Sequence, residues 1–205
     1  MHSLRLTAII VCVLCVARTA HADNGSFIDE RVGKDTGGVY RAQDAVPVAL
    51  GLMVAGCALW NGTEDRFGRT CWVAGESAIA SYGLAKGLQV LTKREPPSDT
   101  SDPSRWSSSH SHGGSFPSGH VAFTTAIVTP FVLDYFEDRP WVAALLLLPA
   151  YEMFARVKAR DHWQTDVLAG ALLGFAIGAY EHHYDSPFVF TILPGGAFVG
   201  FHHYF

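Results

Sequence analysis

The sequence predicts an all-α fold, a bundle of about five core helices with a short C-terminal β-hairpin. Apolar segments of helical length recur between residues 46 and 180, and turn signals separate them. The last twenty or so residues differ, because two short segments rich in aromatic and β-branched residues flank the turn at Pro194. A chain of 205 residues fits one domain with a sizeable core.

The first 22 residues have the pattern of a secretory signal. A basic start at Arg5 precedes an apolar run and a small-residue cleavage site that ends at Ala22. The run is shorter than the roughly 20 residues that span a bilayer. We therefore predict cleavage after Ala22 and export to the bacterial periplasm or cell envelope, with an uncleaved membrane anchor as the alternative.

Cleavage would leave a mildly acidic protein. It removes Arg5 and Arg18 from the 15 basic residues and leaves 13 against 19 acidic ones, a net charge of −6. No basic patch for nucleic acid is visible, so no nucleic-acid partner is predicted. Five of these 13 basic residues cluster near the motifs described below, at Lys93, Arg94, Arg156, Lys158 and Arg160. This clustering predicts a small anionic substrate.

The first half of the mature chain is expected to contain a polar arm and two helices. Residues 23–44 form the Gly-rich arm, which we expect to be loosely packed, and the main domain is expected over residues 45–182. Its first two helices are predicted at 46–60 and 71–92, on either side of a turn at 61–65. Cys57 and Cys71 flank that turn. Export favours a disulfide between them, and two buried thiols are the alternative.

A long segment and three helices are expected next. Residues 93–116 are rich in Pro, Ser, Asp and His and lack periodicity, which marks them as functional or mobile. Helices are predicted at 118–136 with Pro117 in the first turn, at 140–157 with a kink at Pro149, and at 163–180. Gly170, Gly174 and Gly178 form a stripe on the last helix that allows close approach of another helix.

Residues 183–205 are expected to form the hairpin appendage. The predicted helices are short for crossing a bilayer. We therefore predict an exported protein that contacts a membrane surface. An integral membrane protein with its site facing the periplasm is the alternative. The oligomeric state is not predicted.

Ser118, Gly119 and His120 form the first candidate site segment. A helix that begins here has free N–H groups and a positive dipole end, which together bind phosphate. Gly119 lets an anion approach the backbone, and His120 is placed to protonate a leaving oxygen. The segment therefore predicts a phosphate-binding helix start with a general acid.

Arg156, His162 and Asp166 form the second segment. Asp166 lies one helical turn after His162, so its carboxylate is expected to accept a hydrogen bond from one ring nitrogen. That contact would leave the other nitrogen basic and able to attack phosphorus. Arg156 offers a planar fork for two phosphate oxygens.

The pair of motifs, Ser-Phe-Pro-Ser-Gly-His over 115–120 and Arg-x5-His-x3-Asp over 156–166, resembles the type 2 phosphatidic acid phosphatase (PAP2) superfamily. This superfamily includes acid phosphatases and vanadium haloperoxidases, and the resemblance covers roughly residues 45–180. It implies that His162 forms a phosphohistidine, that Asp166 orients it and that His120 is the general acid. It assigns phosphate binding to Ser118, Gly119 and Arg156, and it implies no metal and no other cofactor.

The chain departs from the family's first motif, Lys-x6-Arg-Pro with an extra Arg two residues before the Arg-Pro pair. Aligning Pro97 with the family proline keeps Arg94 as the extra Arg and puts Gln89 where the family has Lys. We expect Arg94 to bind phosphate. Lys86, one turn before Gln89, or Lys93 would replace the missing lysine, and the sequence leaves open which.

These residues predict a phosphatase that hydrolyses a phosphomonoester or a pyrophosphate ester, with a lipid phosphate as the expected substrate. The altered first motif keeps open a non-catalytic envelope protein with the same fold. A vanadate-dependent haloperoxidase is a further alternative. The histidine pairs at 182–183 and 202–203 have no suitably spaced Cys or carboxylate, so no metal site is predicted. His110 and His112 are expected to lie in a solvated loop, with a metal or substrate-gating role as the alternative.

Overall fold

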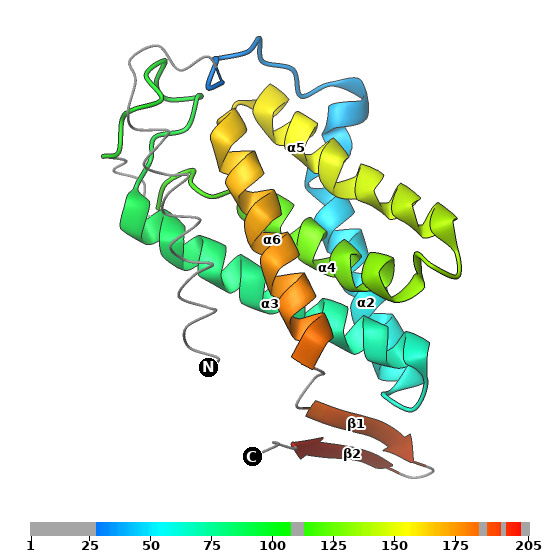
Figure 1. The fold of residues 1–205 in the computed structure, drawn as a ribbon. Coiled ribbons are helices and arrows are strands. Elements are labelled where there is room, and N and C mark those ends of the chain that lie inside the picture. The colour runs from blue at the N-terminus through cyan, green and yellow to red at the C-terminus, as the bar shows by residue number, and fades with distance from the viewer. Residues whose placement is uncertain (1–27, 108–112, 185–187, 194–195, 202–205) are drawn as a thin grey trace.

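The structure is a computed structural model that describes residues 28–107, 113–184, 188–193 and 196–201 (Figure 1). The predicted signal and the histidines at 110, 112, 202 and 203 lie outside the described residues. The main helices are α2 (Ala45–Asn61), α3 (Arg66–Thr92), α4 (Gly119–Tyr135), α5 (Leu147–Ala159) and α6 (Gln164–Tyr184). Two 3-10 helices, η1 (Gly38–Gln43) and η2 (Pro140–Leu146), precede α2 and α5. The predicted all-α class is confirmed for this helical domain.

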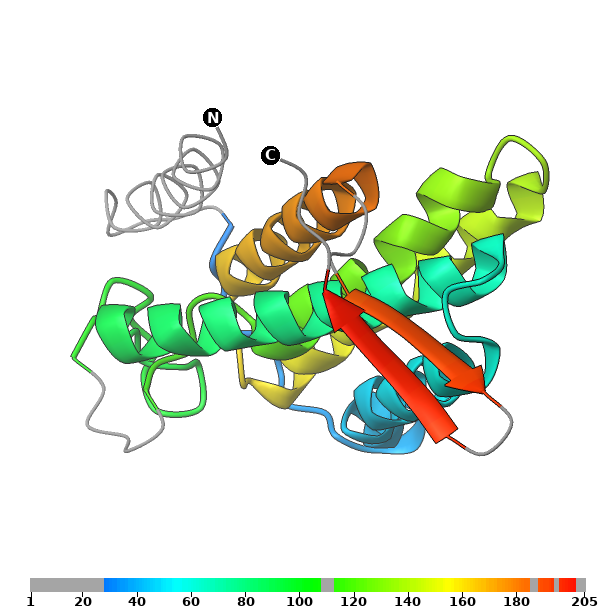
Figure 2. The same cartoon turned by 90° about the horizontal axis from the view of Figure 1, so that it is seen from below.

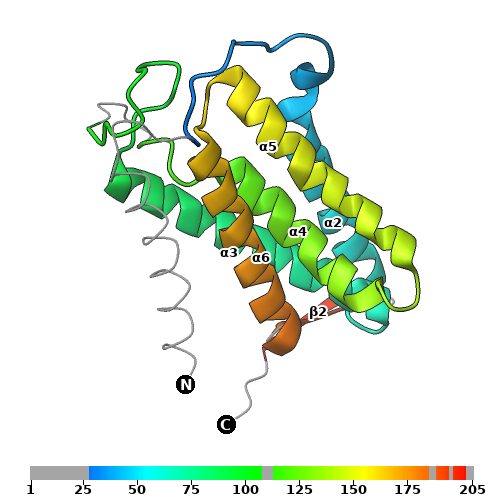
Figure 3. The ribbon, with the colours of Figure 1, turned by 45° about the horizontal axis from the view of Figure 1, so that its top comes forward.

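Helix α4 lies at the centre of the bundle, in contact with α2, α3, α5 and α6 (Figure 3). Its inward residues are small or β-branched, and Val121, Ala122 and Ala126 have no exposed surface. Small side chains let four neighbours pack around one helix, so the core forms on all sides of α4.

The predicted glycine stripe on α6 is confirmed as a helix contact with α4. A Cβ atom on Gly170 would lie 2.5 Å from the Ser118 carbonyl oxygen, and one on Gly174 would lie 2.3 Å from that of Ala122. Only glycine permits this approach. The stripe therefore brings the start of α6, which follows His162, against the start of α4, which carries His120.

The helix boundaries differ from expectation at two places. Helix α3 begins five residues earlier than predicted, where Asp65 accepts a hydrogen bond from the Gly68 N–H at 2.6 Å and caps the helix. The predicted single helix with a kink at Pro149 is wrong. The 3-10 helix η2 ends at Leu146, and Pro149 lies in the first turn of α5, where a missing N–H costs nothing.

Two connections tie the outer segments to the bundle. A disulfide joins Cys57 on α2 to Cys71 on α3, which decides between the two alternatives left by the sequence. The polar arm is also held more firmly than expected. Asp29 is only 5% exposed and accepts hydrogen bonds from the backbone N–H and the hydroxyl of Thr165, at 2.9 and 2.7 Å.

Beyond α6 the chain contains two short strands, β1 (Phe188–Leu193) and β2 (Gly196–Phe201). They pair antiparallel with Phe188 opposite Phe201, and they lie below the bundle in Figure 1 and in front of it in Figure 2, which is seen from below. Residues 194–195 and nearly all side chains of this segment lie outside what the structure describes. The predicted hairpin at residues 183–205, as a part of the fold, therefore stays a prediction.

Several helices expose large apolar side chains. Trp60 on α2 is 86% exposed, and Ile79 and Leu91 on α3 are 75% and 78% exposed. Over the described ranges, none of the helices combines the length and the hydropathy that a membrane crossing requires.

Candidate active site

The two predicted segments meet in one pocket of about 320 Å³ at the end of the bundle where α3 and α5 end and α4 and α6 begin. The pocket is lined by Lys86, Gln89, Pro96, Gly113, Gly114, Ser115, His120, Arg156, Asp161 and His162. Four predicted site residues therefore share it, namely Lys86, His120, Arg156 and His162. We call it the catalytic pocket, because it contains the residues for which the sequence predicts a catalytic role.

His162 lies just before α6 and is only 8% exposed. Its Nδ1 atom is 2.7 Å from the carbonyl oxygen of Ser115. Because a carbonyl only accepts hydrogen bonds, Nδ1 carries the proton and donates it. The Nε2 atom is then unprotonated, which is the form that a nucleophile needs.

Asp166 is placed differently from the expectation that it hydrogen-bonds the ring. Its Oδ2 atom is 3.9 Å from His162 Nδ1, so this contact is electrostatic, while the Ser115 carbonyl orients the ring. Asp166 is fully buried and accepts a hydrogen bond from the Trp163 N–H at 2.8 Å. Burial alone would raise the pKa of Asp166, but His162, the Arg94 guanidinium and that N–H hold it below its usual range.

Arg94 does not line the catalytic pocket, and this corrects the prediction that it binds phosphate. Its side chain has no exposed surface. The guanidinium forms ion pairs with Asp29 at 2.6 Å and Asp166 at 2.5 Å. It also donates to the Thr165 hydroxyl at 2.7 Å and to the Pro103 carbonyl at 3.0 Å. With its donors engaged inside the protein, Arg94 is placed to hold Asp166 rather than a ligand.

Arg156 lines the pocket and is 5% exposed. Its Nη2 atom donates to the Gln43 carbonyl at 2.9 Å and pairs with Asp44 at 2.8 Å, and its Nη1 atom pairs with Asp161 at 3.3 Å. The side chains of Asp44 and Asp161 are 77% and 45% exposed. Both carboxylates can therefore turn into water and leave the guanidinium to a phosphate.

Glu152 lies behind Arg156 on the same helix. Its side chain is fully buried, and its Oε2 atom is 3.5 Å from Arg156 Nε. Burial raises the pKa of Glu152 to about 7, although the Arg156 charge acts in the opposite direction. Nothing in the sequence motifs pointed to this carboxyl group.

Lys86 lines the catalytic pocket, whereas Lys93 does not. The Lys86 ammonium donates to the Gln89 side-chain oxygen at 3.0 Å, and the Gln89 amide donates to the Pro117 carbonyl at 2.7 Å. Gln89 and Lys86 thus line the pocket together, joined by a hydrogen bond. Lys93 instead ends α3 in a left-handed conformation.

Ser118 and Gly119 lie at the start of α4 but are not among the pocket-lining residues. Helix α4 begins at Gly119, so Pro117 precedes the helix rather than opening it. The Ser118 N–H donates to the Asp166 carbonyl at 2.9 Å and joins the two segments. The Ser118 hydroxyl is buried and has no hydrogen-bond partner among the residues that the structure describes.

His120 sits one residue into α4 and is partly buried. Burial, the Arg156 charge, the neighbouring His162 ring and the Lys86 charge lower the pKa of His120 to about 4, although Asp44 acts in the opposite direction. In this field the ring is neutral at pH 7. A bound phosphate dianion would add negative charge beside the ring and raise its pKa.

The sequence missed several pocket residues because they have little chemical character of their own. Gly113 and Gly114 line the pocket where the loop runs along the end of α3, with the Gly114 N–H donating to the Gln89 carbonyl at 2.8 Å. Ser115 contributes a backbone carbonyl. Asp161 directly precedes His162, so its position beside the motif was the one available signal.

Comparisons with known proteins agree with this geometry. The sequence model of the PAP2 superfamily matches residues 70–189, which include both segments. A lipid A 1-phosphatase of Porphyromonas gingivalis is 37% identical over 65 residues, which cover 31% of this chain and 15% of that protein. No solved structure gives a significant match. The family match spans more than half of the chain and contains the residues that meet in the catalytic pocket, so this protein belongs to the PAP2 superfamily.

Proposed function

We propose that this protein is a phosphatase that hydrolyses a phosphomonoester or a pyrophosphate ester through a phosphohistidine on His162. The observation that carries the proposal is the hydrogen bond from His162 Nδ1 to the Ser115 carbonyl. It leaves Nε2 basic in a pocket that also contains Arg156, Lys86 and His120. Membership of the PAP2 superfamily supports the same reaction.

Arg156 and Lys86 would hold the phosphoryl oxygens. The Arg156 fork replaces its exposed partners Asp44 and Asp161 with two phosphate oxygens, and Lys86 adds a third contact. His120, the second residue of α4, lines the pocket, and the positive end of the α4 dipole would add to this cradle. Cations and amides that are already in place stabilise the charge of the transition state.

The reaction proceeds in two steps. His162 Nε2 attacks phosphorus, the bond from phosphorus to the ester oxygen breaks, and His120 gives its proton to the leaving oxygen. Water then attacks the phosphohistidine, His120 takes the proton from that water, and the N–P bond breaks to release phosphate. His120 can carry the first proton because the bound phosphate raises its pKa.

An apolar groove supports a lipid leaving group. His120 lines both the catalytic pocket and this groove, whose other walls include Val48, Leu52, Tyr82 and Phe123. The general acid marks where the leaving oxygen lies, so the organic part of the substrate continues past His120 into the groove. The name of the matched relative, a lipid A 1-phosphatase, points to the same substrate class.

A lipid substrate also supports a location at the bacterial envelope. The exposed apolar side chains on α2 and α3 offer a surface that can rest on a membrane. Export by the predicted signal would place the protein on the periplasmic side. Extraction of the protein with and without detergent would show whether it rests on the membrane or is embedded in it.

Phosphate release from phosphatidic acid and from p-nitrophenyl phosphate tests the proposal. We expect turnover of both, inhibition by vanadate, and a loss of roughly a thousandfold or more in kcat for His162→Ala. His183→Ala is the matched control, because this exposed histidine lies on the same helix and does not line the pocket. Rapid quenching should trap an acid-labile phosphate on the wild type and not on His162→Ala.

Other outcomes would select the alternatives. Folded protein that turns over no phosphate ester would contradict the phosphatase and favour the non-catalytic envelope protein that the altered first motif suggests. Halide oxidation by peroxide in the presence of vanadate would favour the haloperoxidase. Full activity of His162→Ala would rule out the assigned nucleophile.

A further inference from the structure

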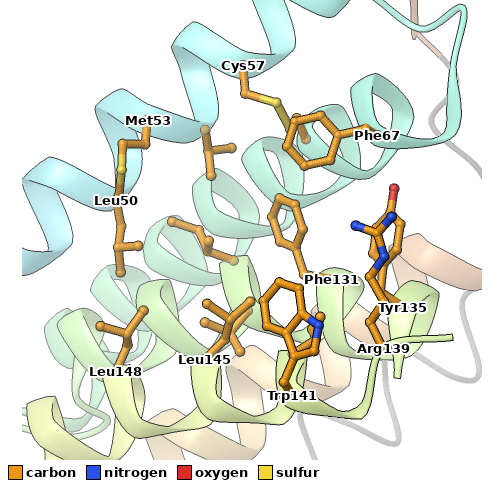
Figure 4. Close-up of a pocket in the computed structure, with 15 residues that line it drawn as sticks. Leu50, Met53, Cys57, Phe67, Phe131, Tyr135, Arg139, Trp141, Leu145 and Leu148 are labelled. Carbon is orange, nitrogen blue, oxygen red and sulfur yellow. A yellow bond between two sulfur atoms is a disulfide. The ribbon is translucent and has the colours of Figure 1, made fainter. Parts of the chain in front are cut away.

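A second pocket lies at the other end of the bundle and shares no residue with the catalytic pocket (Figure 4). It has a volume of about 340 Å³ and lies between α2, the start of α3, the end of α4 and η2. Of its 15 lining residues, only Tyr135, Arg139 and Trp141 carry a hydrogen-bonding side-chain group. Its size and its mostly apolar lining are those of pockets that bind small organic ligands.

The polar groups of this pocket are gathered at one edge. In Figure 4, Arg139 and Tyr135 lie side by side, whereas Leu50, Met53 and Leu148 form the opposite end. The pocket is therefore amphipathic along its length. A matching ligand has a polar head at Arg139 and an apolar chain that extends toward Leu50.

Arg139 is available for such a head group. It is exposed, and its guanidinium makes no ion pair within the described residues. The nearby acidic groups are engaged elsewhere. Asp138 pairs with Arg66 at 2.8 Å, and Asp134 contacts Thr70 and His182.

We propose that this pocket binds a long-chain fatty acid, with its carboxylate on Arg139 and its chain between α2 and η2. One guanidinium matches one carboxylate in charge and in bidentate geometry. The apolar lining can make van der Waals contacts with a chain of methylene groups that the chain would lack in water. The site is independent of the proposed phosphatase reaction.

Quenching of tryptophan fluorescence by a dibrominated stearate tests the site, because Trp141 lines the pocket. We expect saturable quenching in the full-length protein, and Trp141→Phe should remove the saturable component. Arg139→Gln should weaken the affinity about tenfold, which corresponds to about 1.4 kcal/mol. The methyl ester of the same acid should bind the wild type with the affinity that the acid has for Arg139→Gln.

Two controls check specificity. Arg69→Gln removes an exposed arginine that bonds backbone carbonyls of the 63–64 turn and does not line the pocket, so its affinity should equal that of the wild type. Leu145→Phe partly fills the pocket and should weaken binding without touching the head-group site. Saturating vanadate should leave the affinity unchanged, because the catalytic pocket lies elsewhere.

Several results would overturn the proposal. Equal affinities for the acid and its methyl ester would remove Arg139 as the head-group site. Loss of fatty-acid quenching under vanadate would place the ligand in the catalytic pocket. Quenching of Trp141 by vesicles of a brominated neutral phospholipid, without quenching by the fatty acid, would mean that bilayer lipid covers this surface.

Discussion

Two groups of charged side chains lie at the catalytic end of the bundle, and they contain the same residue types in opposite surroundings. In the buried group, Arg94 pairs with Asp29 and Asp166, and all three side chains have no exposed surface. In the pocket group, Arg156 pairs with Asp44 and Asp161, whose side chains are largely exposed.

The difference shows why one arginine is structural and the other can bind a ligand. Separating a buried pair leaves an uncompensated charge in a region of low dielectric, so the buried group stays closed. An exposed carboxylate is rehydrated when it leaves its partner, so in the proposed reaction the pocket group would exchange carboxylate for phosphate at little cost. Whether an arginine can bind a ligand therefore depends on whether its carboxylate partners can separate from it into water.

The largest expected effect is on stability, at Arg94. Arg94→Met leaves Asp29 and Asp166 buried without a counter-charge and should lower the free energy of unfolding by about 3–5 kcal/mol. Urea denaturation measures this loss, and Arg31→Met, which removes a less buried arginine of the same end, is the control. If Arg94→Met kept the stability of the wild type but bound phosphate more weakly, the structural role would be contradicted and Arg94 would be a phosphate-binding residue.

At Arg156 the largest effect should be on catalysis. Arg156→Gln should lower kcat/KM for p-nitrophenyl phosphate by roughly 100- to 1000-fold, because a preorganised contact to the phosphoryl oxygens is lost. Arg160→Gln, which removes a neighbouring arginine bonded to the Val32 carbonyl, should retain most activity. If Arg156→Gln lost stability as Arg94→Met does and kept its kcat/KM, the contrast between the two groups would fail.

A pH profile should locate the proton on His120. A general acid must be protonated, and the pKa of His120 is lowered to about 4, so kcat/KM for an alkyl phosphate should fall as pH rises above about 4. The fall in kcat should begin at a higher pH, because bound phosphate raises the pKa. His120→Ala should slow alkyl phosphates much more than p-nitrophenyl phosphate, whose leaving group needs little protonation. Equal slowing of both would contradict the acid role.

The smallest effect is expected at Asp161, which competes with phosphate for Arg156. Asp161→Asn should lower KM for a phosphate ester about two- to fivefold, the range of an exposed ion pair, with little change in kcat. Asp138→Asn at the far end of the bundle is the control. An unchanged or raised KM would mean that Asp161 positions Arg156 instead of competing for it.

Local patterns predicted the helices and the two motif segments because both depend on neighbours in the sequence. The turn at 61–65 and the glycine stripe of α6 led to correct elements. Pro149 misled because proline allows either a kink or a helix start, and the local sequence does not choose between them. His162 and Arg156 line the same pocket because they stand at the ends of helices that meet there.

Contacts between distant residues could not be predicted in the same way. The tautomer of His162 depends on the carbonyl of Ser115, 47 positions earlier. The burial of Arg94 depends on Asp29, 65 positions earlier in an arm that looked loosely packed. No periodicity or spacing reports such partners.

The sequence by itself determined which chemical groups the protein has and which helix ends carry them, and it determined membership of a phosphate-handling superfamily. Only the tertiary structure decided which arginine and which lysine line the pocket and which oxygen orients His162. The physical reason is that a charged side chain acquires its role from desolvation and from its partners. Both are properties of the packed protein and not of neighbouring residues along the chain.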